Sequence, residues 1–152
     1  MTKTDPGSAP EIFDRQGWMG VLAKAAPARL AALFPDEPAH AMLRAPEVGA
    51  VMVRGHAGGT GAPFNLGEMT VTRCTLRLAG GQVGHAMVAG RDRVHARRAA
   101  LVDALMQTDR AGAIRAAVLE PLVAEAAAAR ATRAAKAAAT RVEFFTLVRG
   151  ED

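Results

Sequence analysis

Residues 69–89 read MTVTRCTLRLAGGQVGHAMVA, and this stretch decides the fold. Its first half is rich in threonine, leucine and valine, and its second half returns to valine and methionine after Gly80-Gly81. A Gly-Gly pair between two runs that favour strands is typical of a turn between antiparallel strands. We therefore predict strands over residues 69–78 and 82–89.

Two more strands are predicted upstream of this pair. Residues 40–44 alternate weakly between polar and apolar side chains, and residues 48–54 are nearly continuous in valine and methionine. Residues 45–47, Ala-Pro-Glu, separate the two runs. Residues 55–67 hold five glycines and one proline, so we expect a loop there. The economical arrangement is an antiparallel meander of about four strands.

Helices are predicted on both sides of the strands. Asp14 suits the N-cap of a first helix, and Pro27 suits the first turn of a second one. After Gly90 the apolar residues recur at helical spacing as far as Met106. The polar residues of this third helix fall largely elsewhere around it, and they are Arg93, Arg97, Arg98 and Asp103.

The remaining helices are predicted in the C-terminal part of the chain. One covers residues 111–119 and is broken at Glu120-Pro121, where another begins and runs to about Thr140. Beyond Val123 that last helix has no apolar side chain larger than alanine. It therefore has a high helix propensity but little to bury.

The composition allows only a modest core. The chain has 152 residues, of which 35 are alanine and 32 are leucine, isoleucine, valine or phenylalanine. We predict one α+β domain over residues 12–140, in which N- and C-terminal helices pack on a small antiparallel meander. Residues 1–11 are expected to be a disordered tail, and residues 141–152 a C-terminal docking segment.

Several classes of protein are excluded by the sequence. No apolar run is long enough to span a bilayer, and the polar start of the chain lacks the features of a secretory signal. Cys74 is the one cysteine, and the four histidines show no metal-ligand spacing with it. We therefore expect a cytoplasmic protein with no metal site, in which Cys74 is a small buried hydrophobe rather than a nucleophile. No catalytic residue is assigned.

Three features are candidates for binding an anion such as phosphate. The run Gly58-Gly59-Thr60-Gly61 could present successive backbone N–H groups, although a tight connection between strands explains it as well. Arg91 and His95 lie in an arginine-rich helix start with Asp92 as N-cap, and the alternative there is a solvated, capped helix end. Arg73, on a strand among threonines, is the third candidate.

The end of the chain is a candidate partner interface. It holds the densest group of large apolar residues, namely Val142, Phe144, Phe145, Leu147 and Val148. These side chains either complete the core of the domain or dock into another protein. We favour docking, because an alanine-rich helix separates them from the domain.

Three stretches together resemble a known family. They are Gly58–Gly61 with Phe64, Gly67, Thr70, Thr72 and Arg73; Gly90–Asp92 with His95-Ala96, Ala100-Leu101 and Asp103–Gln107; and Arg141–Thr146 with Val148–Gly150. In this order they are similar to the G subunit of the bacterial phosphonate carbon–phosphorus lyase system, over about residues 14–150.

The resemblance implies a role in phosphonate catabolism. In that system the G, H, I and L subunits are required for methylphosphonate to displace adenine from MgATP, giving ribose 1-methylphosphonate 5-triphosphate. The G, H, I and J subunits form a two-fold core assembly, and the L subunit resembles ABC-type ATPases. The resemblance transfers no catalytic residue to this chain and implies no cofactor bound by it, since MgATP is a substrate of the whole complex.

Two other functions remain open at this point. A sequence pI of about 10.2 and a net charge of +4 would suit a nucleic-acid-binding module, but the chain has no tyrosine and no helix-turn-helix pattern. A stand-alone transferase would have to turn over ATP and methylphosphonate without partners, and we expect no such activity.

Overall fold

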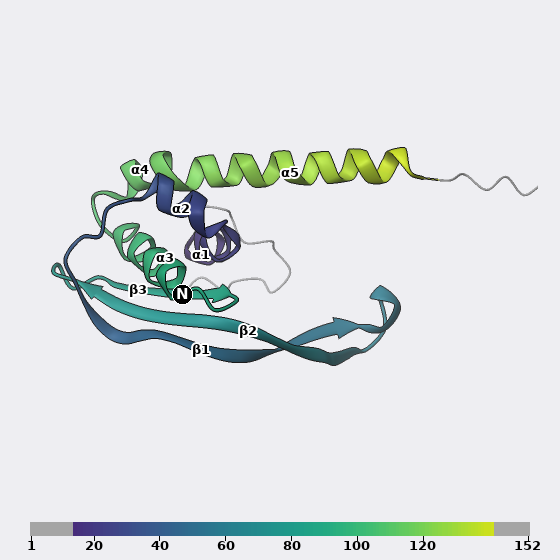
Figure 1. Cartoon of the computed structure of the whole chain (residues 1–152), viewed down its shortest axis with the longest axis horizontal. Helices are drawn as coiled ribbons and strands as arrows, with labels where there is room; N and C mark the ends of the chain where they lie inside the picture. The colour runs from purple at the N-terminus through teal and green to yellow at the C-terminus, as the bar shows by residue number, and fades with distance from the viewer. Residues whose placement is uncertain (1–13, 142–152) are drawn as a thin grey trace, which may run out of the picture.

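The computed structural model describes residues 14–141, which form a three-stranded antiparallel sheet with helices packed on one of its faces (Figure 1). The strand order is β1-β2-β3, so the predicted α+β meander is confirmed. The elements are α1 (Arg15–Lys24), α2 (Pro27–Leu33), β1 (His40–His56), β2 (Pro63–Leu78), β3 (Val83–Ala89), α3 (Arg93–Leu105), α4 (Ala111–Ile114) and α5 (Glu120–Ala139).

The first two predicted strands are one continuous strand, β1, so the described residues form three strands instead of about four. Pro46, which was expected to separate them, lies in a stretch of β1 where the register with β2 shifts twice. Proline removes a ladder hydrogen bond, but an edge strand tolerates this at a bulge. β1 is an edge strand, and it therefore passes Pro46 without ending.

The predicted loop over residues 55–67 is also shorter than expected. β1 continues to His56 and β2 begins at Pro63, so most of the stretch is paired. β3 reaches only as far as the pair Val71–Ala89. Residues 50–56 and 63–70 therefore pair only with each other in the described structure, and this two-stranded ribbon projects from the domain (Figure 1). We call residues 50–70 the hairpin arm.

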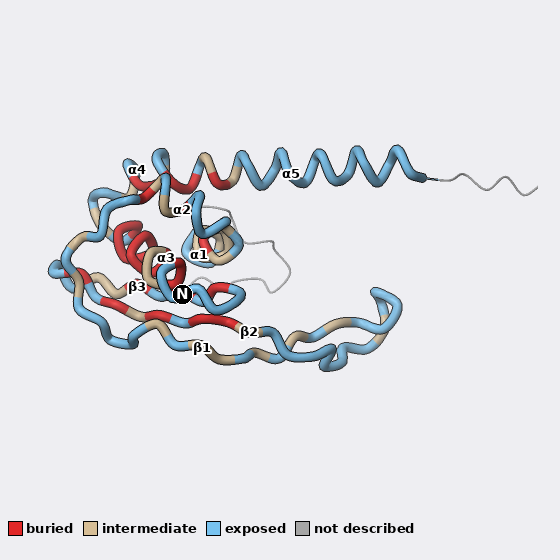
Figure 2. The backbone as a smooth tube through the Cα atoms, in the orientation of Figure 1, coloured by how far each residue is buried: buried red, intermediate tan, exposed pale blue. Residues whose placement is uncertain are grey.

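The core lies between the helices and one face of the sheet. Alternate residues along much of β2 and β3 are buried on this face. Figure 2 shows α3, which is largely buried, lying across these strands. The helix comes unusually close at Gly84 of β3, where an added Cβ would lie 1.9 Å from the Ala100 carbonyl oxygen and 2.8 Å from the Ala104 Cβ. Small residues on both elements are what allow this approach.

A buried carboxylate joins α1, β3 and α3. Asp103 has no exposed surface, although the helical periodicity had placed it off the apolar face. Its two oxygens accept hydrogen bonds from Arg15 Nε (3.2 Å), Arg15 Nη2 (2.8 Å), Trp18 Nε1 (2.9 Å) and the His85 backbone N–H (2.8 Å). A buried charge is tolerated when it is paired and fully hydrogen-bonded, as it is here.

The C-terminal helices follow one another without the expected break. A π-helical turn over Arg115–Leu119 joins α4 to α5, and Pro121 lies at the start of α5. Proline cannot donate an N–H within a helix, and here a π turn directly precedes the proline. Leu122 is the last buried residue of α5, and from residue 124 onwards the helix is exposed (Figure 2).

Within the described residues no helix has both the length and the apolar character required to cross a bilayer.

Cys74 is buried on the core face of β2, as predicted. Burial raises the pKa of its thiol, and the nearby positive charge of Arg97 only partly opposes this. Since the thiolate is the reactive form, we expect labelling of the native chain by a disulfide reagent at pH 8 to be about 100-fold slower than labelling in urea. Rapid stoichiometric labelling of the folded chain would contradict this placement.

Candidate functional site

The glycine-rich run forms the tip of the hairpin arm. Gly58 and Gly59 have φ values of 60° and 84°, a region that favours glycine. The N–H groups of Thr60 and Gly61 both donate to the Ala57 carbonyl, and His56 Nδ1 lies 2.7 Å from the Gly61 oxygen. Two of the four N–H groups in the proposed anion nest are therefore used by the turn itself. This geometry accounts for the glycines without a ligand.

Arg73 lies on the face of the sheet that the described helices leave open. It is exposed, and it pairs in register with Glu47 of β1 and Met87 of β3. A Cβ built on Gly49 would lie 3.5 Å from Arg73 Nη2, so the guanidinium extends over that glycine. Arg73 is thus a cation on a flat surface, available to an anion that approaches this face.

Arg91 occupies the short connection between β3 and α3. The connection is fixed to β2, because the Gly90 N–H donates to the Thr70 carbonyl over 2.9 Å and Thr72 Oγ1 donates to the Gly90 carbonyl over 2.8 Å. Asp92 is the N-cap of α3, as predicted. Arg91 is exposed, so its side chain is also available to an anion.

His95 has a different position from the one expected of an anion ligand. It is 4% exposed, and its Nε2 lies 2.9 Å from the Leu22 carbonyl oxygen of α1. The side chain therefore ties α3 to α1 inside the core. His95 lies one turn beyond Arg91 along the chain, and this position is buried because α1 covers that face of α3.

The structure does not bring all the candidates together. Arg73 and Arg91 lie near the same end of the three-stranded part of the sheet. The glycine tip is at the far end of the hairpin arm, and the eight residues from Thr70 to Pro63 alone span about 23 Å at roughly 3.3 Å per residue. Any site that used both arginines would not include the tip.

Two other arginines of the arginine-rich helix start have a partner that the sequence did not indicate. Arg97 and Arg98 of α3 share the Glu37 carboxylate, at 2.7 Å and 3.9 Å from its Oε1. Glu37 lies in the segment between α2 and β1, about 60 residues away along the chain. Helical spacing does not show which distant residue pairs with an arginine, so the contact with Glu37 could not be predicted. It fixes the loop against α3 and leaves one positive charge in excess.

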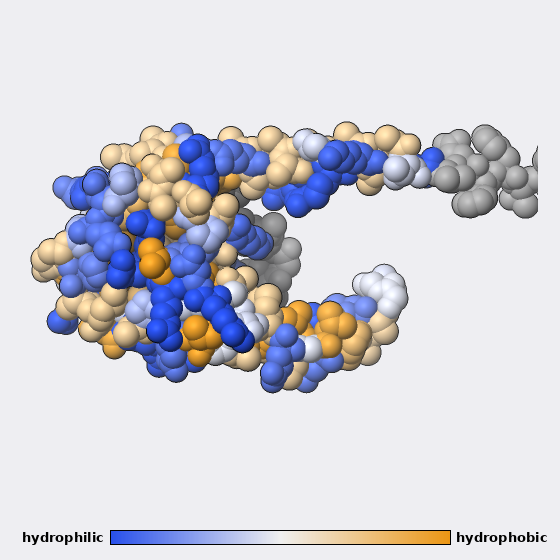
Figure 3. All heavy atoms as spheres, viewed as in Figure 1, coloured by the Kyte–Doolittle hydropathy of each residue, from blue (hydrophilic) through white to orange (hydrophobic). Residues whose placement is uncertain are grey.

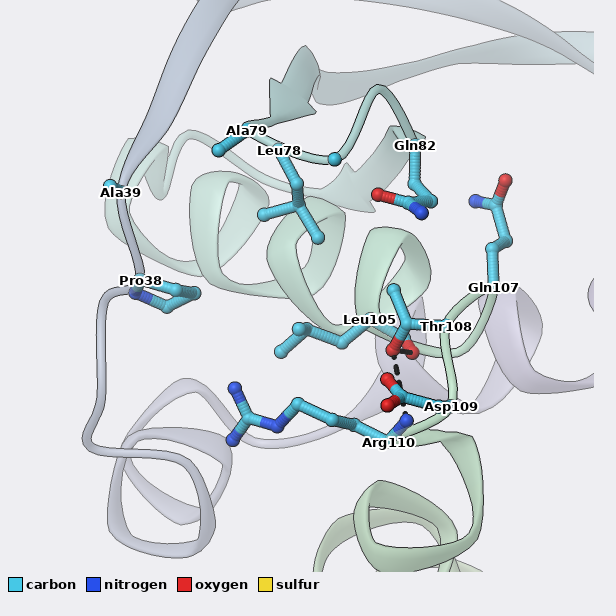
Figure 4. Close-up of a pocket in the computed structure, with 11 residues that line it drawn as sticks. Pro38, Ala39, Leu78, Ala79, Gln82, Leu105, Gln107, Thr108, Asp109 and Arg110 are labelled. Atoms are coloured by element: carbon cyan, nitrogen blue, oxygen red, sulfur yellow. Dashed lines mark hydrogen bonds between the residues drawn. The ribbon is translucent and has the colours of Figure 1, made fainter.

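The described cavities contain none of the candidate anion ligands. A shallow cavity of about 680 Å³ lies at the other end of the sheet, where Leu78 and Leu105 point into it and Arg110 extends towards the segment that carries Pro38 (Figure 4). A second, of about 470 Å³, lies between α1, α2 and α5 beside the Arg29–Glu125 ion pair. Both are structural depressions at element junctions.

Residues 14–141 hold no group of three or more His, Cys, Asp or Glu side chains that could bind a metal ion. The candidate interface residues lie outside the described part of the chain, and they are Val142, Phe144, Phe145, Leu147 and Val148.

Comparison with known proteins gives a family match and a curated relative. Residues 13–150 match a family model described as "Phosphonate metabolism protein PhnG". The chain is also 46% identical over 144 residues to "Alpha-D-ribose 1-methylphosphonate 5-triphosphate synthase subunit PhnG" of Rhizobium meliloti (strain 1021), a match that covers 93% of this chain and 92% of the relative. Neither match favours the nucleic-acid-binding alternative.

Proposed function

The chain belongs to the PhnG family of phosphonate metabolism proteins, and we propose from this membership that it is a subunit of an α-D-ribose 1-methylphosphonate 5-triphosphate synthase. The observation that carries the proposal is the 46% identity to a relative of that name over nearly the full length of both chains. The three sequence stretches quoted above resemble the same family.

The proposed reaction joins methylphosphonate to the ribose of MgATP. A phosphonate oxygen forms a bond to the ribose anomeric carbon, and the bond from that carbon to adenine breaks. The product keeps the 5-triphosphate. We propose that the H, I and L subunits are required with this chain, and that the catalytic groups lie on a partner. The G, H, I and J subunits would form a two-fold core in the cytoplasm, where MgATP is available.

This chain would then support the reaction by binding and positioning. Both substrates are anions, and an arginine can stabilise their charge with charge-assisted hydrogen bonds. Arg73 and Arg91 are exposed and lie near the same end of the sheet, which makes them the best candidates of this chain for contacting the triphosphate or the phosphonate.

Co-expression with the H, I, J and L subunits tests the proposed function. We expect this chain to purify with the core subunits, and the complete set to release adenine from MgATP only when methylphosphonate is present. The chain alone should release none. Full adenine release by the other subunits without this chain, or its failure to purify with them, would contradict the proposal.

Replacing Arg91 or Arg73 with alanine tests the anion contact. A hydrogen bond to a charged group contributes roughly 1.5–3 kcal/mol, so each variant should bind MgATP about ten-fold more weakly within an intact assembly. Affinity is measured by titration calorimetry and assembly by size-exclusion chromatography. Arg133→Ala, on the exposed part of α5, is the matched control and should bind normally. Unchanged affinity for MgATP in both test variants would rule out the proposed contact.

A further inference from the structure

One face of the hairpin arm is apolar. Val51 pairs with Met69 and Val53 pairs with Gly67, and paired residues point to the same side of a ribbon. A Cβ built on Gly55 would lie 3.8 Å from both Leu66 Cβ and Phe64 Cε1, which places these two side chains on that side as well. We call Val51, Val53, Phe64, Leu66 and Met69 the apolar face of the arm.

This face is exposed to an unusual degree for side chains of this size. Phe64 is 45% exposed, Leu66 66% and Met69 43%. Hydrophobic side chains can be seen along the projecting arm in Figure 3. The helices pack on the opposite face of the sheet, so no described element covers these residues. A contiguous exposed apolar patch commonly marks a protein interface.

The arm also has little support of its own. A two-stranded hairpin is at best marginally stable in water, and this one extends beyond the third strand. A surface that packed against its apolar face would bury Phe64, Leu66 and Met69 together and would supply the missing layer. The arm thus has the geometry of an element that is completed by another molecule.

The charges on the same side of the sheet indicate what that molecule is like. By strand alternation Arg73 and Arg77 lie on this side, on the body of the domain. Glu47 is also on this side, but its contact is with Arg44, at 3.9 Å. The side therefore carries excess positive charge next to an apolar arm.

A second copy of this chain fits such a surface poorly. A two-fold axis along the strands would bring Arg73 and Arg77 against their own equivalents. An axis parallel to the sheet but perpendicular to the strands would lay the apolar arm of each copy over the arginines of the other and bury unpaired charge. A different protein can instead present apolar side chains to the arm and carboxylates to Arg77.

We propose that the apolar face of the hairpin arm is a docking surface for another subunit of the synthase core, one that presents an apolar patch bordered by acidic residues. The inference rests on the proposed function, since that function supplies the partner. It adds an interface within residues 50–77, separate from the C-terminal segment expected from the sequence.

The test compares the two faces of the arm. Leu66→Ser and Phe64→Ser change the apolar face, whereas Met52→Ser changes the other face at a residue that is 52% exposed and pairs with Glu68. Each variant of the full chain is co-expressed with tagged H, I and J subunits, and the amount that co-purifies is measured. We expect at least a ten-fold loss for Leu66→Ser and Phe64→Ser, and wild-type recovery for Met52→Ser.

The acidic border is tested by Arg77→Glu, which should also reduce co-purification, and more strongly at low salt than at high salt. All of these side chains are exposed, so thermal unfolding of each lone variant should match wild type and exclude misfolding as the cause. If the wild-type chain co-purifies with the other subunits and all variants do so equally well, the docking inference is overturned but the proposed function is not. Failure of the wild-type chain to assemble overturns the proposed function with it. A lone chain whose mass doubles in a Leu66-dependent manner would identify a second copy as the occupant and overturn the inference.

Discussion

Gly84→Ala is expected to destabilise the chain more than alanine at any other described glycine, by about 3 kcal/mol or more. The new Cβ would lie 1.9 Å from the Ala100 carbonyl oxygen and 2.9 Å from the Ala104 backbone nitrogen. Both are backbone atoms of α3, so no side-chain rotation relieves the overlap. The helix would have to move away from β3, and the close packing beneath it would be lost.

Gly67→Ala is the matched control, because Gly67 is also a strand glycine but has open space around its Cβ position. Its stability should change little, since alanine is no worse than glycine in an extended backbone. Urea unfolding followed by circular dichroism measures both variants. A Gly84→Ala chain with the wild-type midpoint would show that α3 does not pack on β3 as described.

Asp103→Ala is the second change with a large expected effect, a loss of about 3–5 kcal/mol. The substitution removes the acceptor for Trp18 Nε1 and for the His85 N–H, and it leaves Arg15 without its partner. Arg15 is partly exposed and can be hydrated, but the other two donors lose a buried acceptor. The junction of α1, β3 and α3 should therefore loosen as one unit.

Asp109→Ala, a change at an exposed aspartate shortly after α3, is the control for loss of an acidic side chain. A double-mutant cycle with Arg15→Ala separates the ion pair from the other contacts. Because Asp103 without Arg15 would be a buried charge with less compensation, Arg15→Ala alone should also destabilise. Additive effects of the two substitutions would contradict the pairing.

The sequence predicts the sheet and most helices because local patterns control them. The alternation of residues 69–89 and the Gly80-Gly81 turn are sufficient for the β2–β3 hairpin, and Asp14 and Asp92 cap the helices they precede. The errors lie where the signal depends on a neighbour. Pro46 looks like a strand end until β1 is known to be an edge strand, and Pro121 looks like a break until a π turn accommodates it.

The candidate site is predicted less well, for a similar reason. Charge and exposure are visible in the sequence for Arg73 and Arg91, and the structure leaves both exposed. His95 and Asp103 look like polar surface residues of a helix, but α1 packs over both and makes them internal. Their roles are set by contacts with residues 73 to 88 positions away, which helical periodicity cannot reveal.

The exposed part of α5 holds the end of the helix at a fixed distance from the domain. From residue 124 to Ala139 the helix extends about 24 Å at 1.5 Å per residue. Its first part contacts the domain through the Arg29–Glu125 ion pair and the depression beside it, and the rest extends past the domain. A helical spacer holds its span, whereas a coil of the same length would contract. Arg141 therefore lies well outside the body of the domain, at a distance from the sheet that the length of α5 determines.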